Sequence, residues 1–409
     1  MIHSKRNYIT LSIFDFLYLF TWSAAMSFFV IWLNQALNIN STNTGFLYMG
    51  MSICAMVLQP FFGYISDKFG LRKNFVYAIL FILIPIGPFF IYVYAPLLVS
   101  HFWIGLLIGS IYLSLVFNAG YGVIDSYIDK VSRKCGFEYG RVRMWGSLGW
   151  AAATFIVGRA ITHTPDFAFW FASASAILAL IFFWLTKVDV SDVDINTSSS
   201  VSIKDVSNLI QNKQFWYLLV FGIGVSCVYE VYDQQFGNYF VSFFASKEEG
   251  NKWFGDLASV QVVGETIFLC LMPFIVNKFG AKNCLILAGF IMSFRIIGSA
   301  MPWGTVWIAA MKMLHAIEKP LIVVTIFKYI SFNFNSKMAS TTYLSYLFSM
   351  SLATAILSPI IGHMYEVLDY RKTYMILGVI SLTFTTFALL TLKSDKNSLT
   401  KEIQKEVVL

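Results

Sequence analysis

The sequence predicts an all-α integral membrane protein with twelve transmembrane helices in two related halves of six. Hydrophobic residues make up 57% of the 409-residue chain, charged residues only 12%, and the apolar residues form long runs between short polar breaks. An ordinary soluble protein carries roughly 25% charged residues. About 12 spans of about 22 residues, joined by loops of about 10, use nearly the whole chain. No room remains for a sizeable soluble domain.

Six apolar runs in each half justify the twelve helices, because each is long enough to cross the hydrocarbon core. In the first half they lie near Tyr8–Leu33, Gly45–Ser66, Asn74–Leu97, His101–Ile124, Tyr139–Ile161 and Phe167–Leu185. In the second half they lie near Phe215–Phe244, Trp253–Val276, Asn283–Met301, Val306–Ile330, Thr341–Tyr365 and Thr373–Leu392. The first run has no small-residue cleavage site, so we expect a membrane helix and not a signal peptide.

A long polar stretch at 187–213, rich in Asp and Ser, separates the halves and is expected to be a linker. We expect an N-terminal bundle at 1–186, a cytoplasmic linker at 187–213, a C-terminal bundle at 214–393 and a cytoplasmic tail at 394–409. A weak repeat supports two related halves, since Lys68-Phe-Gly70 follows the second span and Lys278-Phe-Gly280 follows the eighth. Transporters often build their site at the interface of such repeats.

The net charge of +7 reflects short basic clusters between the apolar runs, which indicates membrane sorting and not nucleic-acid binding. Loops on one side carry Lys68, Arg72, Lys73, Lys130, Arg133, Lys134, Lys278, Lys282, Lys328 and Lys337, and loops on the other carry Arg159, Lys247, Lys252, Arg371 and Lys372. The bias predicts both termini in the cytoplasm. The five cysteines have no ligand-like spacing and are read as small buried hydrophobes, so no disulfide or metal is expected.

Many ionisable residues lie within or near the apolar runs: Asp15, Asp125, Arg143, Glu230, Asp233, Glu265, Arg295, Lys312, His315, Glu318 and Lys319. Each costs about 2.5 to 3.5 kcal/mol at a helix centre on insertion scales, so each should face a cavity or a partner.

In the first half, Arg143 and Trp150 are seven residues apart and share a helix face. Asp125, on the preceding helix, can hold Arg143 in a bidentate pair while both bond hydroxyls, and the indole can cover the C–H face of a sugar. The alternative is an interhelical salt bridge beside an ordinary core Trp. Asn118 is a further candidate nearby, although a packing or helix-contact role is the favoured reading for it.

In the second half, Tyr229 and Asp233 share a face, as do Gln261 and Glu265, because each pair is four residues apart. Lys312, His315 and Glu318 step by three and spread over about 120°, so they can address several helices. This arrangement suits a relay better than a single clamp.

Several motifs resemble a known family. The loop Gly63–Lys73 resembles the loop after the second helix of the major facilitator superfamily, although Leu71 replaces a basic residue. Lys130-Val-Ser-Arg-Lys, Phe137-Glu-Tyr-Gly-Arg-Val-Arg143, Tyr229-Glu-Val-Tyr-Asp233-Gln-Gln and His315-Ala-Ile-Glu318 together resemble the bacterial oligosaccharide/proton symporters, the lactose, raffinose and sucrose permeases. The resemblance covers nearly the whole chain.

The resemblance implies a major facilitator fold and assigns roles to these positions. Asp125, Arg143 and Trp150 match the sugar-recognition residues, which implies that the first bundle recognises sugar. Asp233 and Lys312 match a charge pair, read as mainly structural. Glu318 matches the carboxylate that gains and loses the coupled proton, surrounded by positions matching Tyr229, His315 and Arg295, which implies that the second bundle couples the proton.

Differences between this sequence and the lactose or sucrose permease indicate which sugar is transported. The Gln261–Glu265 spacing, Asp125 and Ser351 resemble the sucrose permease, and Val262 stands where the lactose permease has a substrate-binding Glu. Against this, three positions are closer to the lactose type: Arg141, Trp150 and Glu230. Glu230 would lack its usual Lys, and Lys319 is our candidate replacement partner. Asp15 either lines the cavity or lies close enough to the end of its helix to reach water.

We therefore expect a proton-coupled symporter in the bacterial cytoplasmic membrane, taking up a disaccharide or small oligosaccharide. Sucrose is favoured, with lactose, melibiose or raffinose open. We expect a monomer with the proton as its coupling ion, no cofactor, no metal and no nucleic-acid partner. An uncoupled sugar facilitator and a drug/proton exporter of the same fold are the alternatives. An enzyme is disfavoured, because no catalytic motif occurs and the five His residues are scattered.

Overall fold

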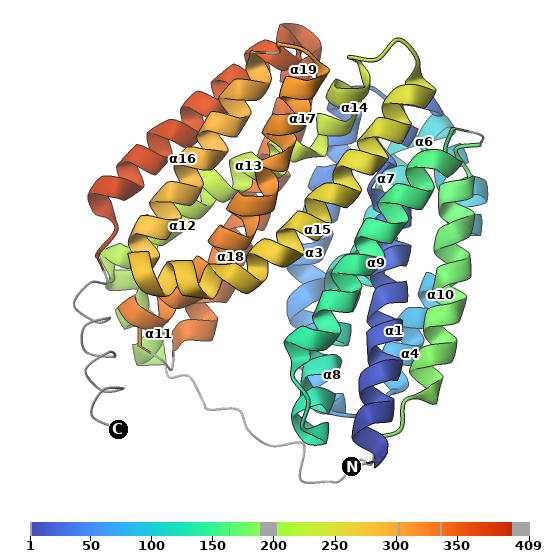
Figure 1. The fold of residues 1–409 in the computed structure, drawn as a ribbon, viewed down its shortest axis with the longest axis horizontal. Coiled ribbons are helices and arrows are strands. Elements are labelled where there is room, and N and C mark those ends of the chain that lie inside the picture. Colours follow the sequence, from blue (N-terminus) through green and yellow to red (C-terminus); the bar gives the residue numbers. More distant parts are fainter. Residues whose placement is uncertain (1, 163, 189–202, 302, 336–337, 395–409) are drawn as a thin grey trace. The chain divides into compact units, whose positions relative to one another are not determined.

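The computed structural model describes residues 2–162, 164–188, 203–301, 303–335 and 338–394, and every element in these ranges is a helix (Figure 1). The first half contains α1 (Ile2–Met26), α2 (Phe29–Gln35), α3 (Ser41–Phe69), α4 (Asn74–Leu83), α5 (Ile86–Pro88), η1 (Phe89–Tyr94), α6 (Ala95–Ser100), α7 (Phe102–Leu113), η2 (Ser114–Ala119), α8 (Gly120–Cys135), α9 (Tyr139–Ala160) and α10 (Phe167–Leu185). Most of the predicted linker (189–202) and nearly all of the predicted tail (395–409) lie outside the described residues.

The second half contains α11 (Ile203–Gln211), α12 (Lys213–Phe221), η4 (Gly222–Cys227), α13 (Val228–Gln234), α14 (Phe236–Val241), α15 (Lys247–Phe279), α16 (Ala281–Ala300), α17 (Thr305–Met313), α18 (His315–Asn333) and α19 (Ala339–Thr391). Three short π-helical turns, η1, η2 and η4, interrupt α-helical runs. Two of them directly precede a helix with a candidate carboxylate, η2 before α8 and η4 before α13. Such turns are frequent at functional sites.

The described helices accommodate the twelve predicted crossings. Eight are long and apolar enough to cross a membrane, and the run α4–α6, bent by 44°, makes nine. The two remaining apolar runs fall in α9 and in α17–α18, both of which carry charged residues. The 53-residue α19 would be about 80 Å long if straight. It breaks at Asp369 (φ 72°, ψ 171°), so it supplies two crossings.

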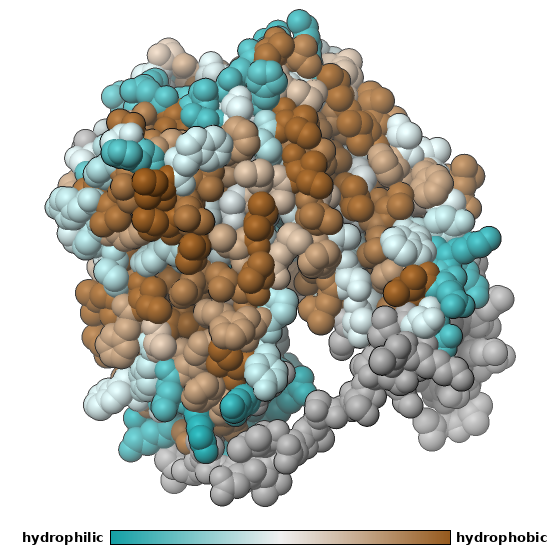
Figure 2. Space-filling view, turned by 180° about the vertical axis from the view of Figure 1, so that it is seen from behind, coloured by the Kyte–Doolittle hydropathy of each residue, from teal (hydrophilic) through white to brown (hydrophobic). Residues whose placement is uncertain are grey.

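The surface of the helices is apolar, as a lipid-facing protein requires. On the face drawn in Figure 2, apolar side chains cover much of the length of the helices, and hydrophilic ones gather towards helix ends. Large side chains such as Trp184, Phe274 and Leu390 are more than two-thirds exposed, at 69%, 74% and 79%. In water these residues would promote aggregation, whereas in lipid they contact acyl chains.

The repeated loops share a backbone feature. Gly70 ends α3 with φ 57°, and Gly280 follows α15 with φ 85°. A left-handed conformation at both positions favours glycine over any residue with a Cβ. The weak Lys-Phe-Gly repeat of the sequence therefore corresponds to a repeated helix ending.

The described chain forms two compact units, each considered by itself. One comprises the helices through α10 together with Gln235–Val263 and Ala355–Glu366, and the other comprises α11–α13, Gly264–Thr354 and the chain from Val367. Within the first unit, Arg159 and Asp256 form an ion pair at 2.5 Å. The first half of α15 therefore packs with α9, although it belongs to the second half of the sequence.

Within the first unit, α1 packs between α9 and α10, as the blue and green ribbons of Figure 1 show. Ser23 donates to the carbonyl oxygen of Trp150 at 3.0 Å, and Ser175 donates to that of Leu17 at 2.8 Å. The approach is close because a Cβ at Gly149 would overlap the backbone of Phe16. Small residues commonly permit such close helix packing in membranes. The contact positions α1 against the face of α9 that holds Arg143 and Trp150.

We predict that Gly149→Ala destabilises the protein by about 1–3 kcal/mol, because its methyl group would force α1 away from α9. Gly140→Ala is the matched control, since it lies on the same helix and its Cβ meets no atom within 4 Å. The melting temperature of the detergent-purified protein is the measurement. Equal melting temperatures for the two variants would contradict the packing described here.

Candidate functional site

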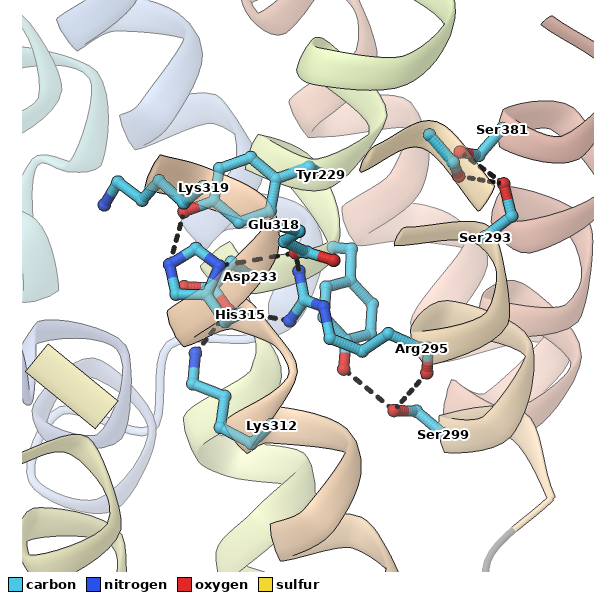
Figure 3. Close-up of polar contacts among 12 residues, drawn as sticks. Tyr229, Asp233, Ser293, Arg295, Ser299, Lys312, His315, Glu318, Lys319 and Ser381 are labelled. Atoms are coloured by element: carbon cyan, nitrogen blue, oxygen red, sulfur yellow. Dashed lines mark hydrogen bonds and ion pairs between the residues drawn. The ribbon is translucent and has the colours of Figure 1, made fainter. Parts of the chain in front are cut away.

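The second unit brings together the carboxylate, imidazole and guanidinium groups that the sequence singles out (Figure 3). Glu318 Oε1 lies 2.5 Å from Arg295 Nη2 and 3.4 Å from His315 Nδ1. The side chains of Arg295 and Glu318 are fully buried, and that of His315 is 2% exposed. Arg295 comes from α16, and the other two come from the first turn of α18. A buried carboxylate is therefore held between two cationic or potentially cationic groups.

The local sequence positions these side chains. The helical run breaks at Leu314, so Lys312 ends α17 while His315 begins α18. His315 and Glu318 then lie three residues apart in one helical turn and face the same way. On the other side, Arg295 is seated against two aromatic faces, with its guanidinium carbon 4.7 Å from the ring centre of Tyr232 and 5.5 Å from that of Tyr229.

One carboxylate oxygen of Glu318 is available for protonation. Both ion pairs use Oε1, whereas Oε2 is buried without a hydrogen-bond partner. The pairing with Arg295 fits an ionised Glu318. Protonation at Oε2 would neutralise the carboxylate and weaken its hold on Arg295. The geometry can therefore store a proton and release it.

The charge pair implied by the resemblance is present. Lys312 Nζ donates to Asp233 Oδ1, and Arg295 Nη1 lies 3.9 Å from the same oxygen. The Lys312 side chain is 6% exposed, so removal of Asp233 would break the ion pair of a buried ammonium group. The arrangement links Lys312 and Arg295 through one carboxylate.

Glu265 joins the same network, which the sequence spacing alone does not indicate. Its Oε1 lies 3.1 Å from His315 Nε2, and its Oε2 lies 3.8 Å from Lys319 Nζ. The hydroxyl of Tyr229 also lies 3.1 Å from His315 Nε2. The imidazole therefore connects Glu265, on α15, with Glu318, on α18.

Lys319, our candidate partner for Glu230, also approaches a second carboxylate. Its Nζ lies 3.8 Å from Glu265 Oε2. Glu230 is within electrostatic range of Lys319 and His315. Lys319 extends from α18 towards α15, because it follows Glu318 in the helix and points to a different side from it.

The cluster holds one more carboxylate than permanent cation among the described residues. The carboxylates are Glu230, Asp233, Glu265 and Glu318, and the cations are Arg295, Lys312 and Lys319. With His315 neutral, one added proton balances the charges. Unbalanced charge is most costly at the fully buried pair of Glu318 and Arg295, whereas the Lys319 side chain is 47% exposed.

A cavity of about 180 Å³ adjoins this cluster within the second unit. Glu230, Glu318 and Lys319 line it together with mostly apolar and aromatic side chains, among them Tyr343 and Tyr346. The hydroxyl of Tyr346 donates to Ser226 at 2.7 Å. The buried carboxylate of Glu318 thus borders a cavity.

The first unit holds a separate cluster around Arg143. The guanidinium carbon of Arg143 lies 5.4 Å from the ring centre of Tyr121, and Nη1 is 3.5 Å from Ser147 Oγ. The bidentate pair predicted with Asp125 does not form. Asp125 instead accepts a hydrogen bond from the hydroxyl of Tyr139. Both charged groups therefore keep hydrogen-bonding capacity for a ligand.

Trp150 is half-buried in an aromatic cluster. Its ring lies 5.6 Å from that of Trp22, which in turn stacks on Phe117 at 5.4 Å. Asn118 lies in the π-helical turn η2 and is half-buried, and Gln261 is buried on α15 one turn before Glu265. An indole beside a guanidinium and a carboxylate suits a sugar, whose hydroxyls and C–H face need these groups.

Sequence reasoning missed several residues of both clusters. In the second unit, Tyr232 covers Arg295, and its hydroxyl lies 2.8 Å from Ser299 Oγ. In the first unit, Tyr121 and Trp22 contact Arg143 and Trp150. Ser299 is four residues after Arg295, so helix spacing could have found it. Trp22 gave no signal, because an aromatic residue in an apolar run is usually a packing residue.

The family model and the similar proteins of known function indicate the same family. The family model described as LacY proton/sugar symporter matches residues 1–404. The raffinose permease of Escherichia coli is 37% identical over 413 aligned positions, which cover 99% of this chain and 97% of that protein. The melibiose permease of Enterobacter cloacae is 38% identical, with 95% and 93% covered, and the sucrose permease of Escherichia coli is 32% identical, with 96% and 95% covered.

A solved structure agrees with this assignment at the level of the fold. The crystal structure of the nucleoside transporter NupG superposes with a TM-score of 0.79 at 16% identity, covering 94% of this chain and 98% of that one. The family match spans nearly the whole chain, and the relatives are transporters of similar length. The chain therefore belongs to the LacY proton/sugar symporter family, and it is a multi-pass membrane transporter with the major facilitator fold and not an enzyme.

Proposed function

We propose that the protein carries a disaccharide or small oligosaccharide into the cell together with a proton, by alternating access. The observation that carries this proposal is the buried Glu318, held by Arg295 and His315 with one oxygen unpartnered. Intramembrane carboxylates beside His commonly mark proton paths. In this mechanism Glu318 is protonated when sugar binds from outside, and the approach of Arg295 favours proton release on the inside.

Sugar and proton are linked in our proposal through His315. Glu265 accepts hydrogen bonds from sugar hydroxyls, and a sugar that draws Glu265 Oε1 away removes one of the two partners of His315 Nε2, leaving the hydroxyl of Tyr229. His315 Nδ1, on the opposite side of the ring, faces Glu318. A change at one nitrogen alters what the other can donate, because neutral imidazole has one donor and one acceptor. Asp233 and Lys312 keep the surrounding charges paired.

For the sugar itself, we propose that Asp125, Arg143 and Trp150 form the main recognition site, with Asn118 and Gln261 as lesser contributors. Sucrose is favoured by the Gln261–Glu265 spacing. The higher overall identity to the raffinose and melibiose permeases keeps galactosides open. Raffinose contains a sucrose unit. A binding site for that unit therefore agrees both with the Gln261–Glu265 spacing and with the higher identity to the raffinose permease.

We further propose that the protein is a monomer in the bacterial cytoplasmic membrane, with the linker and both termini in the cytoplasm. The bias of Lys and Arg among the loops supports this orientation. An uncoupled sugar facilitator of the same fold is the competing function, and it differs in having no need for a titrating Glu318.

Replacement of Glu318 by Gln, which imitates the protonated carboxyl, is predicted to separate exchange from accumulation. Sugar-for-sugar exchange across vesicle membranes should continue, since exchange needs no proton release, and uphill accumulation driven by a pH gradient should be lost. Glu248→Gln is the matched control, because Glu248 is exposed in the first turn of α15. Retained accumulation in Glu318→Gln would refute the assignment of the proton to Glu318.

Arg143→Lys should weaken sugar binding at least about tenfold, because Lys keeps the charge but loses the planar fork that bonds two hydroxyls at once. Arg141→Lys is the control on the same helix, since Arg141 is exposed and pairs only with Glu138 in its own first turn, at 3.2 Å. Equilibrium binding to the purified protein is the measurement. Unchanged affinity in Arg143→Lys would mean that the sugar binds elsewhere.

The orientation is tested with single cysteines in a variant from which the five native cysteines are removed. A membrane-impermeant maleimide applied outside intact cells should label Glu248→Cys and Asp369→Cys and spare Lys134→Cys. All three positions are exposed or lie at a helix break, so reagent access is governed by the side of the membrane. Labelling of Lys134→Cys from outside would invert the proposed topology.

A further inference from the structure

Asp15 is a buried carboxyl group to which the proposed function gives no role. It lies in the apolar helix α1, its exposed fraction is 0%, and neither of its oxygens has a hydrogen bond of normal geometry. The backbone N–H of Gly146 is the nearest donor. A charged residue at a helix centre costs about 2.5 to 3.5 kcal/mol even on insertion scales, so a carboxyl without a partner needs an explanation.

The carboxyl group lies at the level of the proposed sugar site. A Cβ at Gly146 would overlap Asp15 Oδ2, which places the carboxyl directly against α9. Gly146 is three residues after Arg143 and four before Trp150. Asp15 therefore contacts α9 between the turn that holds the guanidinium and the turn that holds the indole.

The groups around Asp15 include more carboxylates than cations. The titratable and charged groups within electrostatic range are Tyr18 on α1, Tyr121 and Asp125 on α8, and Tyr139 and Arg143 on α9. α10, which packs on the other side, contains no ionisable residue. Arg143 is the single cation among these groups, and both carboxylates lie within electrostatic range of it.

The two carboxylates differ in what stabilises their charge. Asp125 is half-buried and accepts a hydrogen bond from Tyr139. Asp15 has neither water nor a hydrogen-bond donor of normal geometry. An ionised Asp15 has to draw on Arg143, whereas a neutral Asp15 leaves Arg143 free. Its protonation state and the position of the guanidinium are therefore linked.

We propose that Asp15 is a second protonatable carboxyl of this transporter, and that its protonation releases Arg143 to bind sugar. The proposal rests on the proposed function, since it takes Arg143 as a sugar-binding residue. Asp15 itself is a positioning residue, because it acts on the sugar through Arg143. Below the pKa of Asp15, the carboxyl is neutral and sugar affinity is high. Above it, the carboxylate competes for the guanidinium and affinity falls.

The test measures equilibrium sugar binding against pH in purified full-length protein that carries Glu318→Gln, so that Glu318 cannot titrate. We expect affinity in Glu318→Gln to fall by up to about tenfold per pH unit above the pKa of Asp15. Adding Asp15→Asn should keep the high acid-side affinity at every pH. Adding Ser12→Ala, which alters another buried and unpartnered polar group on α1, should preserve the pH dependence.

Two results would overturn the proposal: an affinity that does not depend on pH in Glu318→Gln, or an unchanged pH dependence after Asp15→Asn. Asp15→Leu serves as a second variant if Asp15→Asn does not fold, because an apolar side chain suits the buried position. It should likewise abolish the pH dependence.

Infrared difference spectroscopy provides a readout that does not require sugar. At neutral pH, the C=O stretch of a protonated carboxylic acid should be present in Glu318→Gln and weaker in Glu318→Gln/Asp15→Asn. Equal acid bands would show that Asp15 is ionised and would overturn the proposal. Failure of the proposed function would give a different result. In that case no variant would bind any sugar, but the infrared comparison would still report the protonation state of Asp15.

Discussion

The burial of one carboxyl group between a guanidinium and an imidazole is the constraint on which the second half of this transporter depends. Glu318 and Arg295 are both fully buried, and their ion pair at 2.5 Å replaces the hydration that each has lost. A buried pair is costly to break on one side alone, because the remaining charge has no compensation. Neighbouring groups also interact with each of the two charges and so lower that cost. Two tyrosine rings face Arg295, Asp233 lies near it, and His315 contacts Glu318.

The charge composition of the cluster connects this constraint to transport. One carboxylate exceeds the permanent cations, so the cluster is neutral when it holds one proton and carries a negative charge when it holds none. Glu265 is the member of the cluster that also belongs to the proposed sugar site, and it contacts the far side of the same imidazole. In the proposed function, sugar and proton therefore act on the same imidazole, that of His315. In the first unit, Asp15 and Asp125 repeat the pattern around the single cation Arg143.

Much of the fold follows from the sequence, because lipid requires every backbone polar group to be bonded within a helix. Apolar runs therefore predicted the crossings, and the predicted boundary near Tyr365 and Thr373 corresponds to the break of α19 at Asp369. The repeated Lys-Phe-Gly ending was visible in the sequence, and Gly70 and Gly280 both have a positive φ. By contrast, nothing in the sequence indicated the π-helical turns, which depend on a single extra residue in the backbone hydrogen-bond pattern.

The partners of individual side chains were less predictable than their positions. Residue spacing placed His315 and Glu318 on neighbouring faces, and the resemblance supplied the pair of Asp233 with Lys312. It could not show that Tyr139 would bond Asp125 in place of Arg143, because that choice depends on side-chain packing between α8 and α9. The approach of Lys319 to Glu265, in addition to its electrostatic interaction with Glu230, depends likewise on how α15 lies against α18.

The central claim is that sugar and proton cross the membrane together, and direct measurement of the proton tests it most simply. Energy-depleted cells that produce the protein are placed in lightly buffered medium, and sucrose, raffinose, melibiose or lactose is added while external pH and sugar uptake are recorded together. The account predicts that the medium becomes alkaline when a transported sugar is added, because protons enter the cells together with the sugar. Sugar uptake with no change in external pH would contradict it.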